Sequence, residues 1–87
     1  MVRGDTMESY YKSVITINEY GKINLHLKEV MDSKGITRNN LARASNTRFE
    51  VVNKWYNGTV ERIDADILAR FCFTLDCDVS DIIEYVK

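Results

Sequence analysis

Apolar residues return at helical spacing along most of the chain, beginning at Ile23. The first set occupies the i, i+4, i+7 and i+8 positions of one helix face: Ile23, Leu27, Val30 and Met31. Gly35 follows this set, and glycine commonly ends a helix because it adopts the left-handed backbone at low cost. The pattern therefore predicts a first helix that begins at Ile23 and ends just before Gly35.

A short second helix is predicted over Arg38–Ala44. Thr37 precedes it, and a threonine hydroxyl at this position accepts a hydrogen bond from an N–H of the first turn that would otherwise be unpaired. Leu41 falls on the side that would face a core. Residues 45–47 then interrupt the helix, because Asn46 tolerates the left-handed backbone of a sharp turn.

A third helix is predicted over Arg48–Asn57, directly after the turn. Thr47 is placed to cap its start, and Gly58 is placed to end it. Glu50 stands three residues after Thr47, which is the spacing of a capping box. The inward side of this helix should hold its apolar residues, namely Val51, Val52 and Trp55.

Two more helices are predicted in the last third of the chain. Asp64 can cap a fourth helix over Ala65–Leu75, whose apolar stripe consists of Ile67, Leu68, Phe71, Cys72 and Leu75. A last turn or two of helix should follow Asp78 over residues 80–85, with core contacts expected from Val79, Ile82 and Ile83. Five helices joined by short connections predict a compact all-α domain.

The N-terminal part of the chain has a different pattern. Residues 1–13 show no helical or strand period, which is typical of a loose tail. Val14–Ile17 consists entirely of β-branched residues and is a candidate for one short strand. Two partners for that strand stay open, namely the C-terminal segment Ile82–Val86 and the same strand in a second subunit. We therefore divide the chain into an N-terminal tail, residues 1–22, and one domain, residues 23–87.

Composition narrows the class of protein. The chain has 87 residues, of which 45% are hydrophobic, and this suits one small core. Two cysteines and one histidine cannot complete a zinc shell, so no metal or other cofactor is expected, and Cys72 and Cys77 should pack as small apolar side chains. His26 is expected on the surface without a partner. Reduced thiols, no signal-peptide-like start and no bilayer-length apolar run predict a cytoplasmic protein.

The net charge of −1 conceals an uneven distribution along the chain. Residues 34–58 carry five basic residues against one acidic residue, a net charge of +4. Residues 1–33 carry four against five, for −1, and residues 59–87 carry three against seven, for −4. A polyanion should therefore be steered to the face that contains residues 34–58.

Two segments resemble a known family. Residues 35–58, GITRNNLARASNTRFEVVNKWYNG, and residues 62–85, RIDADILARFCFTLDCDVSDIIEY, are similar to the Cro and lambda-repressor-like helix-turn-helix regulators of bacteria and phages. The positions that match the family pattern are Gly35, Ile36, Leu41, Ala42, Asn46, Val52, Asn57 and Gly58. Many members have glycine in place of Asn46 and polar residues where this chain has Phe49 and Val51, so the base preference is open.

The resemblance implies a DNA-binding role in which helix two braces the sugar-phosphate backbone and helix three enters the major groove. Phosphate contacts are expected from Thr37, Arg38, Arg43 and Asn57. Side chains opposite the inward side of helix three are expected to meet base edges or flanking phosphates, namely Arg48, Phe49, Glu50, Asn53 and Lys54. Thr47, at the start of that helix, completes the predicted site.

Other interpretations of these residues stay open. Glu50 can bond to the start of its own helix instead of a base, and Phe49 can pack into the turn. Tyr56 can be a phosphate donor or an aromatic residue at the edge of the core. Three cations can be ordinary solvated charges, namely Arg38, Arg43 and Lys54.

The prediction is a sequence-specific, double-stranded DNA-binding transcriptional regulator, most simply a repressor, that acts as a homodimer on two half-sites. Candidate dimer surfaces are the Val14–Ile17 strand, Tyr10, Tyr11 and the segment Ile82–Val86. The alternative is an antitoxin-like protein-interaction adaptor that docks through the acidic C-terminal third. No nucleophile–base set or phosphate-binding glycine loop stands out, so neither an enzyme nor a small-molecule ligand is expected.

Overall fold

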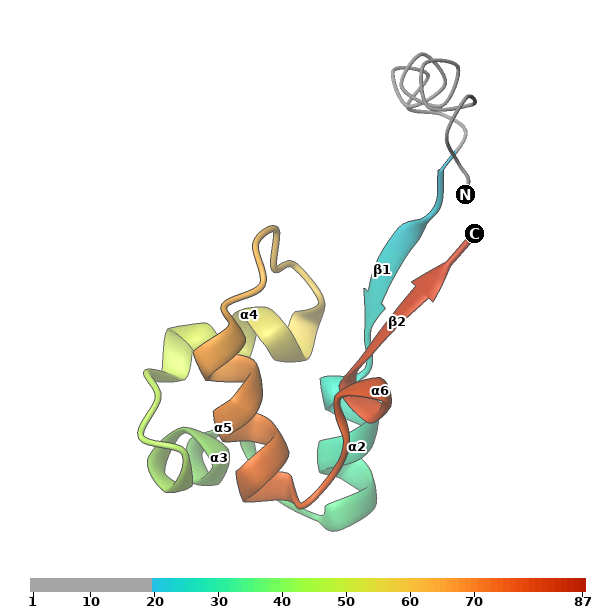
Figure 1. Ribbon diagram of the computed structural model, residues 1–87. Helices are drawn as coiled ribbons and strands as arrows, with labels where there is room; N and C mark the ends of the chain where they lie inside the picture. The colour runs from blue at the N-terminus through green and yellow to red at the C-terminus, as the bar shows by residue number, and fades with distance from the viewer. Residues whose placement is uncertain (1–19) are drawn as a thin grey trace.

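The computed structural model describes residues 20–87, which form five helices and a two-stranded antiparallel sheet (Figure 1). The elements in chain order are β1 (Lys22–Leu25), α2 (Leu27–Lys34), α3 (Arg38–Ala44), α4 (Phe49–Asn57), α5 (Ala65–Leu75), α6 (Val79–Ile82) and β2 (Ile83–Val86). The predicted compact five-helix domain is confirmed, with a small sheet added. The predictions for residues 1–19, including the Val14–Ile17 strand, lie outside the described residues.

One apolar core joins all five helices. Nine side chains are buried in it: Leu27, Met31, Leu41, Val52, Trp55, Leu68, Phe71, Leu75 and Ile82. At its centre the rings of Trp55 and Phe71 meet edge to face, with centroids 5.3 Å apart and planes at 90°. Such a pair contributes more than the area it buries. Both cysteines pack at the edge of this core, and burial raises the pKa of the Cys77 thiol.

Local signals in the sequence set most helix ends. The Asp64 carboxylate accepts hydrogen bonds from the backbone N–H groups of Asp66 and Ile67, which confirms the predicted cap of α5. Gly35 ends α2 and Gly58 ends α4, and both adopt the left-handed backbone with φ of 68° and 73°. Asp76 ends α5 with the same geometry, although it is not glycine.

The small sheet forms a ribbon of strands β1 and β2 that leads away from the helices (Figure 1). Ile23 pairs with Tyr85, and Leu25 pairs with Ile83. These four side chains share one face because side chains alternate along a strand. Leu25 and Ile83 pack against the core, whereas Ile23 and Tyr85 are 52% and 58% exposed.

The first helix was predicted to begin at Ile23, and this is wrong. Ile23 lies in β1, and α2 begins only at Leu27. The backbone N–H of His26 donates to the carbonyl of Ile82, 2.7 Å away, so the chain is held by β2 and α6 before it turns into a helix. A periodicity window cannot detect a strand partner that lies near the opposite end of the chain.

Three predictions about the C-terminal end and His26 are also wrong. The last helix ends at Ile82 instead of Tyr85, because the following residues pair with β1. Val79, predicted to contact the core, is 48% exposed at the start of α6, while Ile82 is buried as predicted. His26 does have a partner, since its Nε2 lies 2.7 Å from the Glu84 carboxylate.

Candidate nucleic-acid interface

Helix α3 has the predicted bounds and the predicted cap. The Thr37 hydroxyl accepts a hydrogen bond from the backbone N–H of Asn40, 3.1 Å away. Leu41 is fully buried and anchors the helix to the core. The first turn of α3, with Arg38 at its start, is exposed to solvent. The predicted phosphate-binding residues therefore lie on an accessible surface.

The turn between α3 and α4 is fixed by its backbone conformation and by two side-chain hydrogen bonds, one local and one from α5. Asn46 adopts the left-handed backbone with φ of 53°, as predicted. The buried hydroxyl of Ser45 donates to the carbonyl of Leu41 at 2.6 Å. The guanidinium of Arg70, on α5, donates to the carbonyl of Asn46 at 2.7 Å. The angle between α3 and α4 is therefore set by the body of the domain before any ligand arrives.

Thr47 does not cap helix α4, so that prediction is wrong. The cap position belongs to Arg48, and within residues 20–87 no side chain bonds to the exposed N–H groups at this end. The Thr47 hydroxyl instead donates to the carbonyl of Ser45 at 3.1 Å and lies 3.0 Å from the Ser45 hydroxyl. The Thr47 hydroxyl is therefore bonded within the turn and is not available to form a capping box with Glu50. Glu50 is left exposed, which overturns the capping-box interpretation.

Helix α4 has two sides of opposite character. Val52 and Trp55 are 0% and 3% exposed and face the core. The residues predicted to meet DNA lie on the other side: Phe49, Glu50 and Lys54 are exposed, as are Arg48 before the helix and Asn57 at its end, while Asn53 is half-buried. Phe49 is 41% exposed, which supports its exposure over packing into the turn.

One contact that the sequence did not predict joins the two helices. The Arg38 guanidinium donates to the side-chain oxygen of Asn53 at 2.7 Å, and it lies over the Tyr56 ring, 4.5 Å from the ring centroid. Asn53 and Tyr56 stand three residues apart on α4, the spacing that places side chains next to each other on a helix. Tyr56 is half-buried at the edge of the core, which is one of the two positions that the sequence left open.

The Tyr56 ring has a second cation nearby, on helix α2. The Lys28 ammonium lies 5.8 Å from the ring centroid and 3.1 Å from the Asp32 carboxylate. The hydrogen bond to that carboxylate, together with its charge, raises the pKa of Lys28. The Asp32 carboxylate offsets the charge of Lys28, so this ion pair adds no net positive charge beside the start of α3.

The cations of the basic stretch are free of ion pairs in the described part of the chain. The four ion pairs found between residues 20 and 87 involve His26, Lys28 and Arg70 as the basic partners. None of them uses Arg38, Arg43, Arg48 or Lys54, and all four of these side chains are exposed. Arg43 does bond to the Asn40 side chain at 2.7 Å, which leaves its charge uncompensated. The surface around α3 and α4 is therefore available to an anion.

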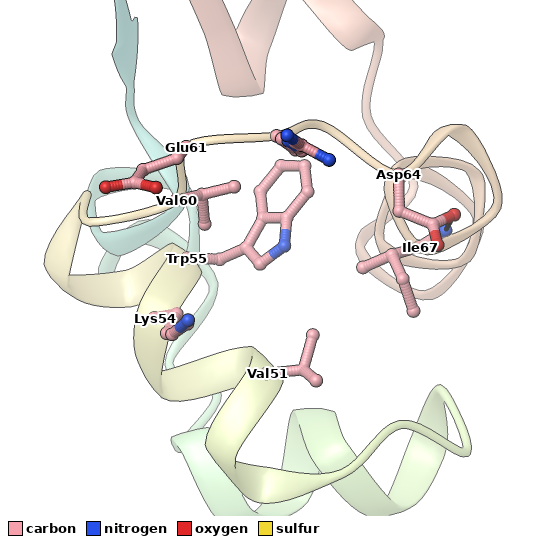
Figure 2. A pocket seen from close by; sticks show the side chains of 8 residues that line it. Val51, Lys54, Trp55, Val60, Glu61, Asp64 and Ile67 are labelled. Atoms are coloured by element: carbon pink, nitrogen blue, oxygen red, sulfur yellow. Dashed lines mark hydrogen bonds between the residues drawn. The ribbon is translucent and has the colours of Figure 1, made fainter.

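A hollow of about 430 Å³ lies on the flank of α4, between that helix, the segment after it and the start of α5 (Figure 2). Its lining combines four apolar and four charged side chains, namely Val51, Lys54, Trp55, Val60, Glu61, Arg62, Asp64 and Ile67. Figure 2 shows the Trp55 ring at the middle of this lining. Its two basic and two acidic side chains offset each other, so the hollow has no preference for an anion. The anion-binding surface is instead the exposed side of α3 and α4.

A short capped helix, a tight left-handed turn and a second helix with a polar outer side define a helix-turn-helix domain. A family comparison agrees, because the model of the Cro/C1-type HTH DNA-binding domain matches residues 26–87. The chain belongs to this family. A search of curated proteins found no match.

The same fold occurs in the crystal structure of a Bacteroides fragilis protein that has been proposed to bind DNA. It superposes with a TM-score of 0.65 at 19% identity, and the match covers 72% of this chain and 100% of that one. Between residues 20 and 87, no helix has the length and apolar character needed to cross a membrane. The same residues contain no group of three or more potential metal-binding side chains.

Proposed function

We propose that this protein is a sequence-specific regulator of transcription that places the outer side of α4 in the major groove of double-stranded DNA. The observation that carries the proposal is the concentration of exposed cations on α3 and α4 that form no ion pair within residues 20–87, next to a helix side that the core does not use. A major groove is wide enough to admit one α-helix. Membership of a DNA-binding family supports the same conclusion.

In this proposal the phosphate contacts come from the two ends of α3 and from the C-terminal end of α4. Thr37, Arg38, Arg43 and Asn57 are exposed and polar or cationic, and such side chains position a protein on the backbone without reading sequence. Thr47 bonds within the turn, so its role in the proposal is to hold α3 and α4 at their angle.

Base contacts come from the outer side of α4. Arg48 and Lys54 suit the O6 and N7 acceptors of guanine, and Glu50 can accept from the amino group of cytosine. Phe49 can contact a thymine methyl group, and Asn53 offers an amide to a base edge. This division predicts that substitutions on α4 change which sequences are bound.

We further propose that the protein acts as a homodimer and represses transcription, in the cytoplasm where its DNA target lies. A single domain of this size contacts few base pairs, so two copies on two half-sites give more useful specificity. The exposed side chains of Ile23 and Tyr85 make the ribbon a candidate dimer surface. The ribbon includes most of the C-terminal segment predicted for this role from the sequence.

The proposal is tested by selecting bound duplexes from a random pool at two salt concentrations. A palindromic consensus is expected, and log K should fall with log salt by about 0.9 for each phosphate contacted. Lys54→Ala and Phe49→Ala should each change the selected sequence, whereas Arg43→Ala should weaken binding to all sequences alike. Binding without sequence preference, or binding that is insensitive to salt, would contradict the proposal.

A protein-interaction adaptor is the second candidate, and one observation favours it. Phe73, on the side of α5 that faces away from the core, is 88% exposed. An apolar side chain beside the acidic Asp76 could dock on a basic partner. In this case Phe73→Ser would abolish partner capture, and the substitutions on α4 would leave it unchanged. The same variant would not affect DNA binding under the first proposal.

A further inference from the structure

The Arg38 side chain is held in place by two groups of the helix proposed to read DNA. Its guanidinium donates to the Asn53 side-chain oxygen at 2.7 Å and stacks over Tyr56 at 4.5 Å. A planar guanidinium is well suited to both contacts at once, because it stacks on aromatic faces and donates in its own plane. Arg38 is therefore positioned relative to Asn53 before DNA binds.

This contact determines which way the Asn53 amide faces. A guanidinium can only donate hydrogen bonds, and an asparagine side chain has one oxygen that accepts and one NH₂ group that donates. The oxygen of Asn53 must therefore point toward Arg38, and this leaves the NH₂ group for a ligand. Asn53 is half-buried, which restricts the alternatives open to its side chain.

An asparagine held in this way should disfavour the base that asparagine usually reads. Adenine is recognised by a bidentate pair, in which the amide oxygen accepts from N6 and the amide nitrogen donates to N7. One lone pair of the Asn53 oxygen is already bonded to Arg38, so adenine N6 must compete for this oxygen, whereas the NH₂ donor is left free for a base edge. Donors match edges that only accept, which are O6 and N7 of guanine and O4 of thymine.

We propose that Arg38 is a positioning residue for specificity, which orients Asn53 to donate to guanine or thymine and to discriminate against adenine. The inference rests on the proposed function, since it requires α4 in the major groove. It changes the role expected for Arg38 from the sequence, where a phosphate contact alone would weaken binding to all sequences equally. Further N–H groups of the guanidinium remain for a phosphate, so the two roles are compatible.

The test compares duplexes selected by the wild type, Arg38→Met and Asn53→Ala. Methionine keeps an aliphatic stem over Tyr56 but has no donor. At one base pair of each half-site the wild type should prefer guanine or thymine, and Arg38→Met should shift the ratio toward adenine by roughly tenfold, the scale of one bidentate contact. Asn53→Ala should remove the preference at that same pair, and adding Arg38→Met to it should change nothing further there.

Arg43→Met is the matched control, because Arg43 is a cation of the same helix that bonds to Asn40 instead of α4. It should weaken all sequences alike and leave every base preference unchanged. Tyr56→Leu is a second variant, which keeps the Arg38 charge but removes its stacking surface. It should shift the base ratio at the same base pair toward adenine, by a smaller factor than Arg38→Met. This result is expected even if Arg38→Met fails to fold.

Three results would overturn the inference while the proposed function stands. The wild type could prefer adenine at the position that Asn53→Ala affects, Asn53→Ala could affect no position, or Arg38→Met and Tyr56→Leu could both leave the base preferences unchanged. A wild-type protein that selects no sequence at all would instead refute the proposed function. The two failures are therefore distinguished within one experiment.

Discussion

The helix-turn-helix unit, Thr37 to Gly58, and the ribbon of β1 and β2 are stabilised in different ways. The cap and the helix ends of the unit are formed by near neighbours, and its turn is held both by local hydroxyls and by Arg70 of α5, while its inner side is buried. The ribbon depends on pairing between the two ends of the described chain, and its outer end exposes Ile23 and Tyr85. The comparison indicates that the unit is a preorganised surface, whereas the ribbon leaves two large side chains exposed at its outer end.

The ribbon is nevertheless attached firmly where it meets the helices. A two-stranded ribbon is marginally stable on its own in water. Here Leu25 and Ile83 pack against the core, and the His26 ring bonds to Glu84 across the junction. Stability should therefore decrease from the core-facing end of the ribbon toward its tip at Gly21.

The largest expected effect comes from Trp55, which packs in the core on the inner side of α4. Trp55→Ala should lower the free energy of unfolding by about 3–5 kcal/mol, because it removes a fully packed aromatic side chain. Urea denaturation followed by circular dichroism measures the loss. Lys54→Ala, on the exposed side of the same helix, should change it by less than about 0.5 kcal/mol. Equal losses for the two variants would contradict the two-sided description of α4.

The next effect should fall on the ribbon and leave the unit intact. A Cβ atom at Gly21 would lie 1.9 Å from the carbonyl oxygen of Val86, so Gly21→Ala forces the strands apart at this end. We expect a loss of about 1–3 kcal/mol, typical of overpacking, and faster amide hydrogen exchange in β1 and β2. Exchange in α3 and α4 should not change. Lys22→Ala is the control, and faster exchange throughout the domain in Gly21→Ala would show that the ribbon and the unit are not separable.

A smaller effect is expected at the turn between α3 and α4. Asn46→Ala should cost about 1 kcal/mol, because alanine lacks the local hydrogen bonding that lets asparagine adopt the left-handed backbone. Asn46→Gly should be neutral or slightly stabilising for the same reason. Thermal unfolding of the three proteins distinguishes these outcomes. If alanine and glycine had the same effect, the turn would not depend on the backbone conformation of this residue.

The smallest effect concerns Glu50, whose capping role the structure contradicts. Glu50→Gln should alter the free energy of unfolding by less than about 0.5 kcal/mol, as is usual for substitutions of exposed surface residues. Under the proposed function it should still alter the base preference on DNA. A loss close to that of a helix cap, about 1 kcal/mol, would restore the capping box.

Sequence patterns predicted the helices well where a local signal existed. Thr37 and Asp64 cap the helices that they were expected to cap, and Gly58 ends α4 as expected. Each of these residues acts on neighbours within one helical turn, so a short window of sequence contains the whole interaction. The buried residues of α4 and α5 follow from the same helical period.

The ribbon could not be predicted in the same way. Ile23 fits the helical period of α2 by coincidence, and its actual partner, Tyr85, lies near the other end of the chain. Thr47 was misassigned because its hydroxyl bonds to the Ser45 carbonyl inside the turn instead of to an N–H group of α4. Of the predicted site, the sequence located the exposed residues of α3 and α4, but the contact between Arg38 and Asn53 depends on the angle between two helices.

The central claim is that DNA binds to the outer side of α4, and amide chemical shifts of the labelled protein test it most directly. Titration with a selected duplex should shift the amide signals of residues 37–57, and a scrambled duplex should cause smaller shifts at the same residues. Added salt should reverse both sets of shifts. Binding that leaves the amides of α4 unchanged, and instead shifts those of α5 or α6, would contradict the account.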